Sequence, residues 1–429
     1  MKRHILLLAA LVFSAVTALA QTLQVWQDDI RTSWIYDANQ LTAPNLFDAT
    51  GITIGDHHHA APFIGMWLTV SDETCPADVV RIDYGESAGN AIVSAPGDLI
   101  DYLTIRNNGF DVDVTVADAL ERELTFDLTG GAGSATFALH GNYKTTVKLD
   151  GVNLNATESP EAAEQPALWI DNGKRISIVV TDGTYNTIAD APTNTRKSAF
   201  YVKGHAEWKG DGAVSISGRA RHAYSSNEYT LLKSSFTGSI SVEQAESDGL
   251  HVEQYLQVNS GIINVRGTKG DAIDVAYVLE DDDVTPTADE HNGEFIMKGG
   301  EIIVTVDAAD TKGVKCEADM TITAGTIRAT ATGDGSRGVS AGRDLYLGSE
   351  DAASDTEAYV WLTASGDEYI DIATGDSSKC RGLKVKGDFY HYRSTLERDA
   401  NSVITKKKIV DVDGTYHALG GTLTNIVIE

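Results

Sequence analysis

Apolar and polar residues alternate in short runs through the middle of the chain, and the same arrangement returns further along. Between residues 247 and 266, apolar residues stand at Leu250, Val252, Leu256 and Val258. At one constant offset the matching positions are Val314, Cys316, Met320 and Ile322. Successive side chains of a strand point to opposite faces, so alternation with period two predicts short β-strands. Helical spacing is absent from this region.

A small residue followed by an apolar one opens each unit of this pattern. The openings are Ala167-Leu168, Ala199-Phe200, Ala223-Tyr224, Gly249-Leu250, Ala272-Ile273, Gly313-Val314, Gly338-Val339 and Gly382-Leu383. Uninterrupted units are 23 to 26 residues long, and longer ones contain insertions such as the acidic loop at 280–290. One such unit cannot bury its inner face alone, whereas units stacked roughly 4.8 Å apart bury a continuous core. Three short strands per unit favour a parallel β-helix over a propeller or leucine-rich repeats.

The N-terminus has the pattern of a secretory signal peptide. Lys2 and Arg3 precede an apolar stretch at 5–16, and Ala18-Leu19-Ala20 has the small residues of a cleavage site. Cleavage after Ala20 is therefore expected, with a secreted, cell-surface or periplasmic location. No later apolar run is long enough to cross a bilayer, so membrane insertion is not expected.

Composition narrows the choice of partners. Lys and Arg number 34 against 62 Asp and Glu, which gives a net charge of -28. This charge repels the phosphate backbone of nucleic acid and anionic membranes. Three cysteines, at Cys75, Cys316 and Cys380, exclude a disulfide-based scaffold, and the sequence does not define their pairing. Cys316 falls on an apolar position and is expected to fill the core.

Four segments carry a resemblance to a known family. They are GNYKTTVKLDGVNL at 141–154, PALWI at 166–170, GKRI at 173–176 and DGTYNTIAD at 182–190. These segments resemble the opening coils of secreted carbohydrate-binding right-handed β-helix proteins, whose fold is similar to that of pectate lyases. The resemblance covers about residues 100–400 and implies binding of calcium and of plant polysaccharides such as cellulose and acidic pectins. Residues 22–56 resemble a short N-terminal β module found on such proteins.

Together these features predict an all-β chain in three parts. We expect a signal peptide at 1–20, an N-terminal β module at 21–100, and a carbohydrate-binding domain at 101–429. That domain is predicted to be a right-handed parallel β-helix, a solenoid with three short strands per coil. The oligomeric state is not indicated by the sequence.

The position two residues after each small residue points outward in this scheme. It is occupied by Trp169, Tyr201, Ser225, His251, Asp274, Lys315, Ser340 and Lys384. We call these eight positions the outward column. Trp169 and Tyr201 at one end are candidates for stacking on the apolar faces of sugar rings. Covering the end of the stack is the alternative role for these two aromatic residues.

The turn before the same strand forms a second column. Asp248 and Asp271 lie directly before the small residue there, and Asp274 is close by in the outward column. Carboxylates from neighbouring units repel one another unless a cation lies between them, and hard oxygen ligands suit Ca²⁺. Asp248, Asp271 and Asp274 are therefore candidate calcium ligands. Solvated acids offset by Lys269 and Lys312 are the alternative.

Basic residues occupy the turn column further along, at Lys312, Arg337 and Arg381. A guanidinium group pairs with a carboxylate through two hydrogen bonds, so this trio is a candidate for binding uronates. No residue is assigned a catalytic role, because no nucleophile elbow, phosphate loop or zinc-protease motif occurs.

The function expected from these features is non-catalytic binding of a plant or cell-surface polysaccharide, assisted by calcium for acidic glycans. The glycan itself, acidic or cellulosic, is not identified by the sequence. A calcium-dependent, pectate-type lyase and a surface scaffold without a glycan ligand remain the alternatives.

Overall fold

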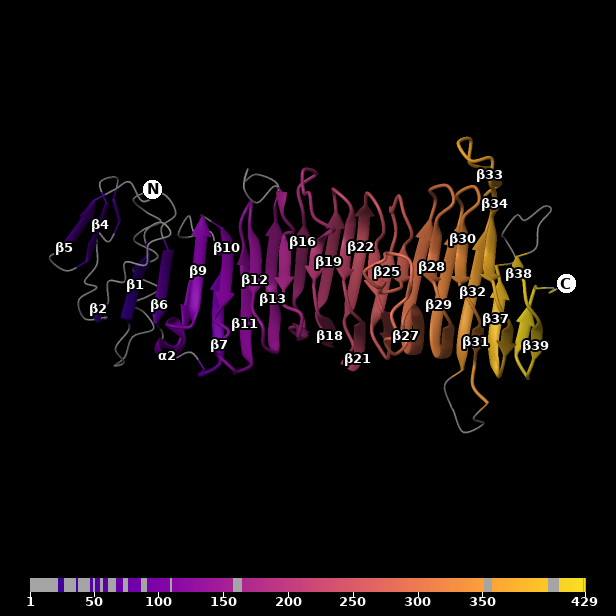
Figure 1. Ribbon diagram of the computed structural model, residues 1–429, viewed down its shortest axis with the longest axis horizontal. Coiled ribbons are helices and arrows are strands. Elements are labelled where there is room, and N and C mark those ends of the chain that lie inside the picture. Colours follow the sequence, from indigo (N-terminus) through magenta and orange to yellow (C-terminus); the bar gives the residue numbers. More distant parts are fainter. Residues whose placement is uncertain are drawn as a thin grey trace.

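The computed structural model describes most of the chain beyond residue 75. The described residues are 76–85, 91–108, 110–156, 164–350, 357–399, 409–426 and 428, with strand segments at 22–26, 36–37, 47–48, 51–54, 57–60 and 67–71. The expected signal peptide at 1–20 and Cys75 lie outside the described residues. The body is elongated, and its strands follow one another along the long axis from the N-terminal to the C-terminal end (Figure 1).

One wall of the body is a sheet of twelve strands. In spatial order its strands are β9 (Leu103–Asn108), β10 (Asp111–Val116), β12 (Thr136–His140), β14 (Leu168–Asp171), β17 (Ser198–Val202), β20 (His222–Ser226), β23 (Leu250–Glu253), β26 (Ile273–Ala276), β28 (Lys312–Cys316), β30 (Arg337–Ala341), β35 (Arg381–Val385) and β38 (Val410–Val412). The first pair, β9 with β10, is antiparallel. From β10 onward each strand pairs in parallel with the next.

The remaining walls belong to a sheet of twenty-three strands, most of which lie in two rows. The first row contains β7 (Val79–Asp83), β11 (Leu124–Gly131), β13 (Thr145–Asn155), β15 (Arg175–Val180), β18 (His205–Gly210), β21 (Thr230–Phe236), β24 (Tyr255–Val258), β27 (Glu294–Val306), β29 (Met320–Ala331), β31 (Leu345–Leu347), β36 (Phe389–His391) and β39 (Tyr416–Ala418). The second row contains β16 (Tyr185–Ala189), β19 (Ala213–Gly218), β22 (Ser239–Ala245), β25 (Ile262–Val265), β32 (Ala358–Ala364), β37 (Ser394–Arg398) and β40 (Thr422–Thr424).

The two rows are not separate, because long strands belong to both. β13 pairs with β15 through residues 145–149 and with β16 through residues 153–155. β27 likewise pairs with β24 and with β25. The parallel pairings therefore close on themselves as in a barrel, through the ten strands β13, β15, β18, β21, β24, β27, β25, β22, β19 and β16.

This closure corrects the predicted fold. The chain is all-β, as predicted, but the prediction of a right-handed β-helix solenoid with three short strands per coil is wrong. The larger sheet contains a closed ring of ten parallel strands instead of separate open stacks. Glycines explain how one strand serves two rows. Gly151 in β13 and Gly300 in β27 have φ values of +72° and +82°, where a side chain is disfavoured, and each lies where its strand changes partner.

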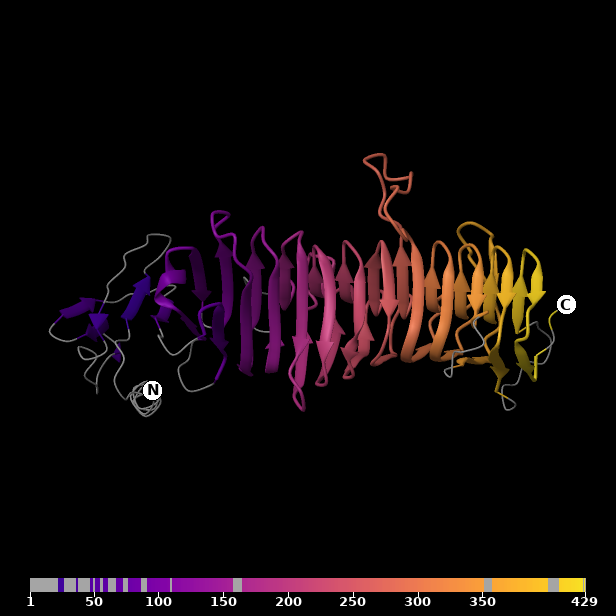
Figure 2. The ribbon, with the colours of Figure 1, turned by 90° about the horizontal axis from the view of Figure 1, so that it is seen from below.

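Smaller elements complete the described chain. β1 (Thr22–Trp26), β2 (Tyr36–Asp37), β6 (Trp67–Ser71) and β8 (Ile92–Ala95) join the larger sheet, and a short helix, α2 (Gly97–Ile100), follows β8. β3 (Phe47–Asp48), β4 (Gly51–Ile54) and β5 (His57–Ala60) form an antiparallel sheet. β33 (Glu368–Ile370) and β34 (Ser377–Lys379) form a hairpin that projects from the body in Figure 1, and the segment between β26 and β27 projects in Figure 2.

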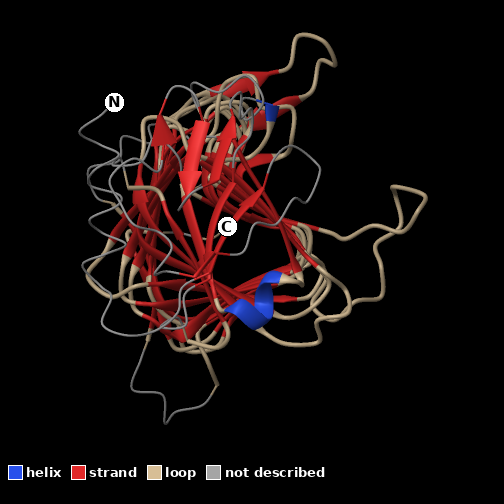
Figure 3. Ribbon diagram, turned by 90° about the vertical axis from the view of Figure 1, so that its left-hand side faces the viewer, coloured by secondary structure: helices blue, strands red, loops and turns tan. Residues whose placement is uncertain are grey.

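The core runs between the sheets, whose strands form the walls seen along the axis in Figure 3. The predicted inward residues are all buried, with at most 1% of their surface exposed: Leu250, Val252, Leu256, Val258, Val314, Cys316 and Ile322. Trp208 is fully buried and packs against Phe200, Tyr224 and Phe236, with ring centroids 5.7–6.0 Å apart. Within the described residues, no helix is long and apolar enough to cross a membrane.

Candidate functional site

The twelve-stranded sheet aligns the outward column. Strand register pairs Trp169 with Tyr201, Tyr201 with Ser225, and each later member with the next, as far as Ser340 with Lys384. Neighbouring parallel strands are about 4.8 Å apart, so these side chains lie next to one another along one face. The alignment of these positions inferred from the sequence pattern is therefore confirmed.

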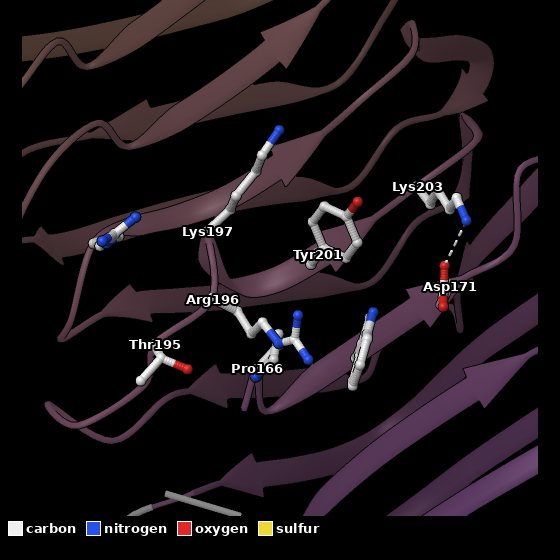
Figure 4. Close-up of a pocket in the computed structure, with 9 residues that line it drawn as sticks. Pro166, Asp171, Thr195, Arg196, Lys197, Tyr201 and Lys203 are labelled. Carbon is white, nitrogen blue, oxygen red and sulfur yellow. Dashed lines mark ion pairs between the residues drawn. The ribbon is translucent and has the colours of Figure 1, made fainter. Parts of the chain in front are cut away.

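Trp169 and Tyr201 line one cavity of about 400 Å³. The other lining residues are Pro166, Asp171, Thr195, Arg196, Lys197, Lys203 and Arg221. We call this cavity the Trp169 pocket (Figure 4). Its floor comes from β14 and β17, and the turn before β17 contributes residues 195–197 to its edge. The structure thus brings together the two aromatic residues that the sequence singled out.

The charge of the Trp169 pocket is opposite to that of the whole chain. It contains four basic side chains, Arg196, Lys197, Lys203 and Arg221, against one carboxylate, that of Asp171. Lys203 pairs with Asp171 at 3.0 Å, and Lys197 donates a hydrogen bond to Glu253 at 2.8 Å. In the described part of the chain, no carboxylate forms an ion pair with Arg196 or Arg221. Both guanidinium groups therefore lack an acidic partner among the residues seen.

Trp169 is held in place from two sides. The guanidinium carbon of Arg196 lies 4.9 Å from the centroid of the Trp169 ring, a cation–π contact. The ring of His140 meets Trp169 edge-on with centroids 5.0 Å apart. His140 in turn lies 3.3 Å from the Asp171 carboxylate and 3.6 Å from that of Asp113. These contacts fix the indole before any ligand arrives.

Ionisation in the pocket follows from burial and from these pairs. The nearby carboxylate of Asp113, with that of Asp171, raises the pKa of His140 against the opposing effect of burial. Burial alone would raise the pKa of Asp171, but the hydrogen bond from Lys203 outweighs it and the pKa is lowered. Burial raises the pKa of Tyr201 to about 12, so its hydroxyl keeps its proton and can donate a hydrogen bond at neutral pH.

The basic trio lies further along the sheet and is not part of this pocket. Lys312, Arg337 and Arg381 occupy aligned positions on β28, β30 and β35. Three strands separate β28 from β17, a distance of about 19 Å. Lys312 donates to the backbone oxygen of Asp310 at 2.5 Å. Arg381 is only 7% exposed and pairs with Asp411 at 3.4 Å, so its guanidinium is already engaged.

The three predicted calcium ligands are close to basic groups. Asp248 and Asp274 both approach Nδ1 of His251, at 3.5 Å and 2.9 Å. Asp271 accepts a hydrogen bond from the backbone N–H of Lys312 at 2.7 Å, and its carboxylate lies 3.9 Å from the Lys315 amino group. Of the three carboxylates, Asp248 alone belongs to a described group of side chains close enough to share one ion, and its partners are His222 and His251.

These contacts shift the pKa values of Asp248, Asp271, Asp274 and His251. Burial by itself raises the pKa of Asp248, but hydrogen bonds with His222 and His251 hold it far below its usual range. Burial raises the pKa of Asp274 as well, but the hydrogen bond with His251 and the charge of Lys315 outweigh it and leave the pKa lowered. Burial opposes protonation of His251, yet its hydrogen bonds to Asp248 and Asp274 raise its pKa to about 9. Burial raises the pKa of Asp271 to about 6, partly offset by Lys312.

Several residues of these sites were not predicted from the sequence. Arg196 and Lys197 lie in the turn before β17, whereas the sequence pattern predicted binding by basic residues of this turn only further along the chain. His222 occupies the same turn position one strand before Asp248, since Tyr224 pairs with Leu250. Applying the repeat spacing to every unit of the turn column would have identified His222.

Comparisons with known proteins place the chain in a family. One solved structure that matches is the "polysaccharide lyase-like protein from C. thermocellum", with 17% sequence identity and a TM-score of 0.44, over 66% of this chain and 96% of that one. No curated protein matches. A family model described as "Carbohydrate-binding domain-containing protein" matches residues 101–391, more than half of the chain, and contains the whole Trp169 pocket. The chain therefore belongs to this family of carbohydrate-binding domain-containing proteins.

Proposed function

We propose that the chain binds an acidic polysaccharide, and that the Trp169 pocket holds one or more of its uronate units. The observation that carries the proposal is the combination, in one cavity, of two aromatic rings and four basic side chains. Family membership supports carbohydrate as the ligand class. The pocket chemistry supports an acidic carbohydrate in particular.

Each part of the pocket has a defined task in this proposal. Trp169 and Tyr201 offer apolar ring surface for the C–H face of a sugar, and both are partly exposed. Arg196 and Arg221 offer guanidinium groups, which pair with a carboxylate through two parallel hydrogen bonds. The cavity of about 400 Å³ is within the usual size range of small-ligand sites. The twelve-stranded sheet continues beyond the pocket as far as β38 and leaves room for the rest of a long glycan.

The positive charge of the Trp169 pocket offsets the repulsion between an acidic glycan and the acidic chain as a whole. A net charge of -28 repels a polyanion at long range. At 0.15 M salt the Debye length is about 8 Å, so contacts within the pocket outweigh the distant acids. Calcium bridging between acidic groups of protein and glycan is a second way to overcome the repulsion. We keep it as part of the proposal, with Asp248, Asp271 and Asp274 as its predicted ligands.

The test is calorimetric titration with oligogalacturonates and, for comparison, neutral cellulose oligosaccharides. We expect binding of oligogalacturonate, and a loss of about tenfold in affinity for Arg196→Gln, because a hydrogen bond to a charged group contributes about 1.5–3 kcal/mol. Arg328→Gln is the matched control, since Arg328 also lies over a tryptophan, Trp361, at 5.9 Å. Equal affinity of both variants and the wild type would refute the pocket assignment.

The calcium part is tested in the same titration with calcium and then with chelator. Stronger binding with calcium, together with a higher melting temperature, would support it, because a cation that binds only the folded state stabilises that state. Superimposable melting curves and unchanged affinity would remove calcium from the proposal and leave the Trp169 pocket in place.

A further inference from the structure

A cluster of metal-binding side chains lies on the twelve-stranded sheet, outside the Trp169 pocket. It consists of His222 on β20, His251 on β23 and Asp248 in the turn before β23, which we call the His222 cluster. One ligand atom from each of the three lies within 4.8 Å of the others. Nδ1 of His222 is 3.1 Å from Oδ2 of Asp248, and Nδ1 of His251 is 3.5 Å from the same oxygen. Two imidazole nitrogens therefore converge on one carboxylate oxygen.

Hydrogen bonds along the turn column position His222 and Asp248. Oδ1 of Asp248 accepts the backbone N–H of Asp271 at 2.7 Å, and Oδ1 of Asp271 accepts that of Lys312 at 2.7 Å. Each turn side chain thus accepts the N–H of the next strand. In the same way, Nδ1 of His222 accepts the N–H of Asp248 at 3.3 Å. Nδ1 of His222 therefore lies beside both the backbone N–H and the carboxylate of Asp248.

The spacing of the three ligand atoms suits one shared ion. Nδ1 of His222 and Oδ2 of Asp248 are 3.1 Å apart, and Nδ1 of His251 is 3.5 Å from the same oxygen. Nitrogen and oxygen ligands of one tetrahedral metal ion, each about 2.0–2.2 Å from it, lie about 3.3 Å from one another. An ion bound there would displace the protons that the cluster shares without it.

The surroundings suit a bound ion that enters from solvent. The His222, Asp248 and His251 side chains are 17%, 14% and 20% exposed, so they are largely fixed but reachable. The two rings are stacked with centroids 4.7 Å apart and planes at 21°, and one nitrogen of each lies within 4.8 Å of the other. Asp274 lies next to His251 at 2.9 Å, and Lys315 holds the other oxygen of Asp274 at 3.0 Å. Binding of an ion through Nδ1 of His251 would therefore replace the contact of that nitrogen with Asp274.

We propose that the His222 cluster is a binding site for a divalent transition-metal ion, with Zn²⁺ as the fitting species. Imidazole nitrogen with carboxylate oxygen is a donor set that Zn²⁺ accepts in tetrahedral sites, with water in the remaining position. Ca²⁺ takes six to eight oxygen ligands, so two nitrogens argue against it at this position, and Asp248 would serve Zn²⁺ here in place of the calcium proposed above. The ion would join β20 to β23 and stabilise the central part of the sheet. This inference does not depend on glycan binding.

The experiment is calorimetric titration of the full chain with Zn²⁺, with Co²⁺ absorption as a second readout of the ligands. The wild type is expected to bind Zn²⁺ and to melt at a higher temperature with it. His222→Ala and Asp248→Asn are expected to weaken binding by at least about tenfold. Asp248→Asn keeps an Oδ1 acceptor for the Asp271 N–H, so this variant preserves the turn column.

A matched control is needed because His57, His58 and His59 form a second group of histidines, on β5. A variant with all three changed to alanine is expected to keep the Zn²⁺ affinity and the cobalt spectrum of the wild type. The proposal is overturned if that variant loses the metal, if His222→Ala and Asp248→Asn retain wild-type affinity, or if the wild type binds no Zn²⁺. Equal metal-free circular dichroism spectra of Asp248→Asn and the wild type would exclude misfolding as the cause of a loss.

Discussion

Acidification should destabilise the fold through one buried histidine, His391. This residue lies on β36, is completely buried, and stacks on Phe389 with ring centroids 5.3 Å apart. Its Nδ1 lies 3.0 Å from the Tyr416 hydroxyl. A Cβ atom added at Gly421 would lie 2.2 Å from the His391 ring, which shows how closely the ring is enclosed. Burial lowers the pKa of His391 to about 4.

The sign and size of the effect follow from this pKa. The unfolded chain has a histidine pKa of about 6.5, so it binds more protons than the folded chain between pH 6.5 and pH 4. The stability that a neutral His391 contributes is therefore present above pH 6.5 and is lost as the pH falls toward 4. With 1.36 kcal/mol for each unit of pKa, the loss in free energy of unfolding between pH 7 and pH 5 is about 2 kcal/mol.

The assay is urea unfolding of the wild type and His391→Gln at pH 7 and at pH 5. Glutamine keeps a polar group near Tyr416 and does not titrate. Other groups titrate over the same range, but they are common to both proteins and cancel in the difference. The wild type should lose about 2 kcal/mol more than the variant on acidification. Equal losses in the two proteins would refute the assignment of a low pKa to His391.

Three further predictions concern the core, a strand bend and catalysis. Trp208→Ala should lower the free energy of unfolding by about 3–5 kcal/mol, measured by chemical denaturation, because it empties the space between Phe200, Tyr224 and Phe236. Gly325→Ala should lower the melting temperature of the protein more than Gly151→Ala does. Both glycines have positive φ, but a Cβ at Gly325 would lie 2.8 Å from backbone and one at Gly151 meets nothing within 4 Å. Polygalacturonate incubated with protein and calcium should give no rise in absorbance from unsaturated uronides, whereas steady release that is lost in Lys312→Ala would favour a lyase.

The strands and their alignment could be predicted from the sequence, but the closure of the larger sheet could not. Alternation with period two predicts that Leu250 and Val252 point inward, whichever strands pair with theirs, and both are buried. The same alternation occurs in one long bent strand and in two short ones. Whether β27 serves one row or both depends on the backbone at Gly300, at φ +82°, and a sequence pattern does not specify that angle.

For a similar reason, only part of the candidate site could be predicted from the sequence. Trp169 and Tyr201 share the outward column, so their spacing along the chain places them together. Arg196 and Arg221 reach the same pocket from turns, where side-chain direction follows no period. His222 and His251 belong to different columns, and their contact through Asp248 depends on how the turn before β23 folds back toward the strand.

Binding of acidic glycan at the Trp169 pocket is the central claim, and one comparison tests it directly. The comparison measures how tightly two variants, Trp169→Ala and Trp361→Ala, bind oligogalacturonate. Both tryptophans are partly exposed on strands and lie under an arginine, but only Trp169 lines the pocket. We predict a loss of at least about tenfold for Trp169→Ala, since stacking and the support of Arg196 are both removed, and wild-type affinity for Trp361→Ala. Wild-type affinity for Trp169→Ala would contradict the account.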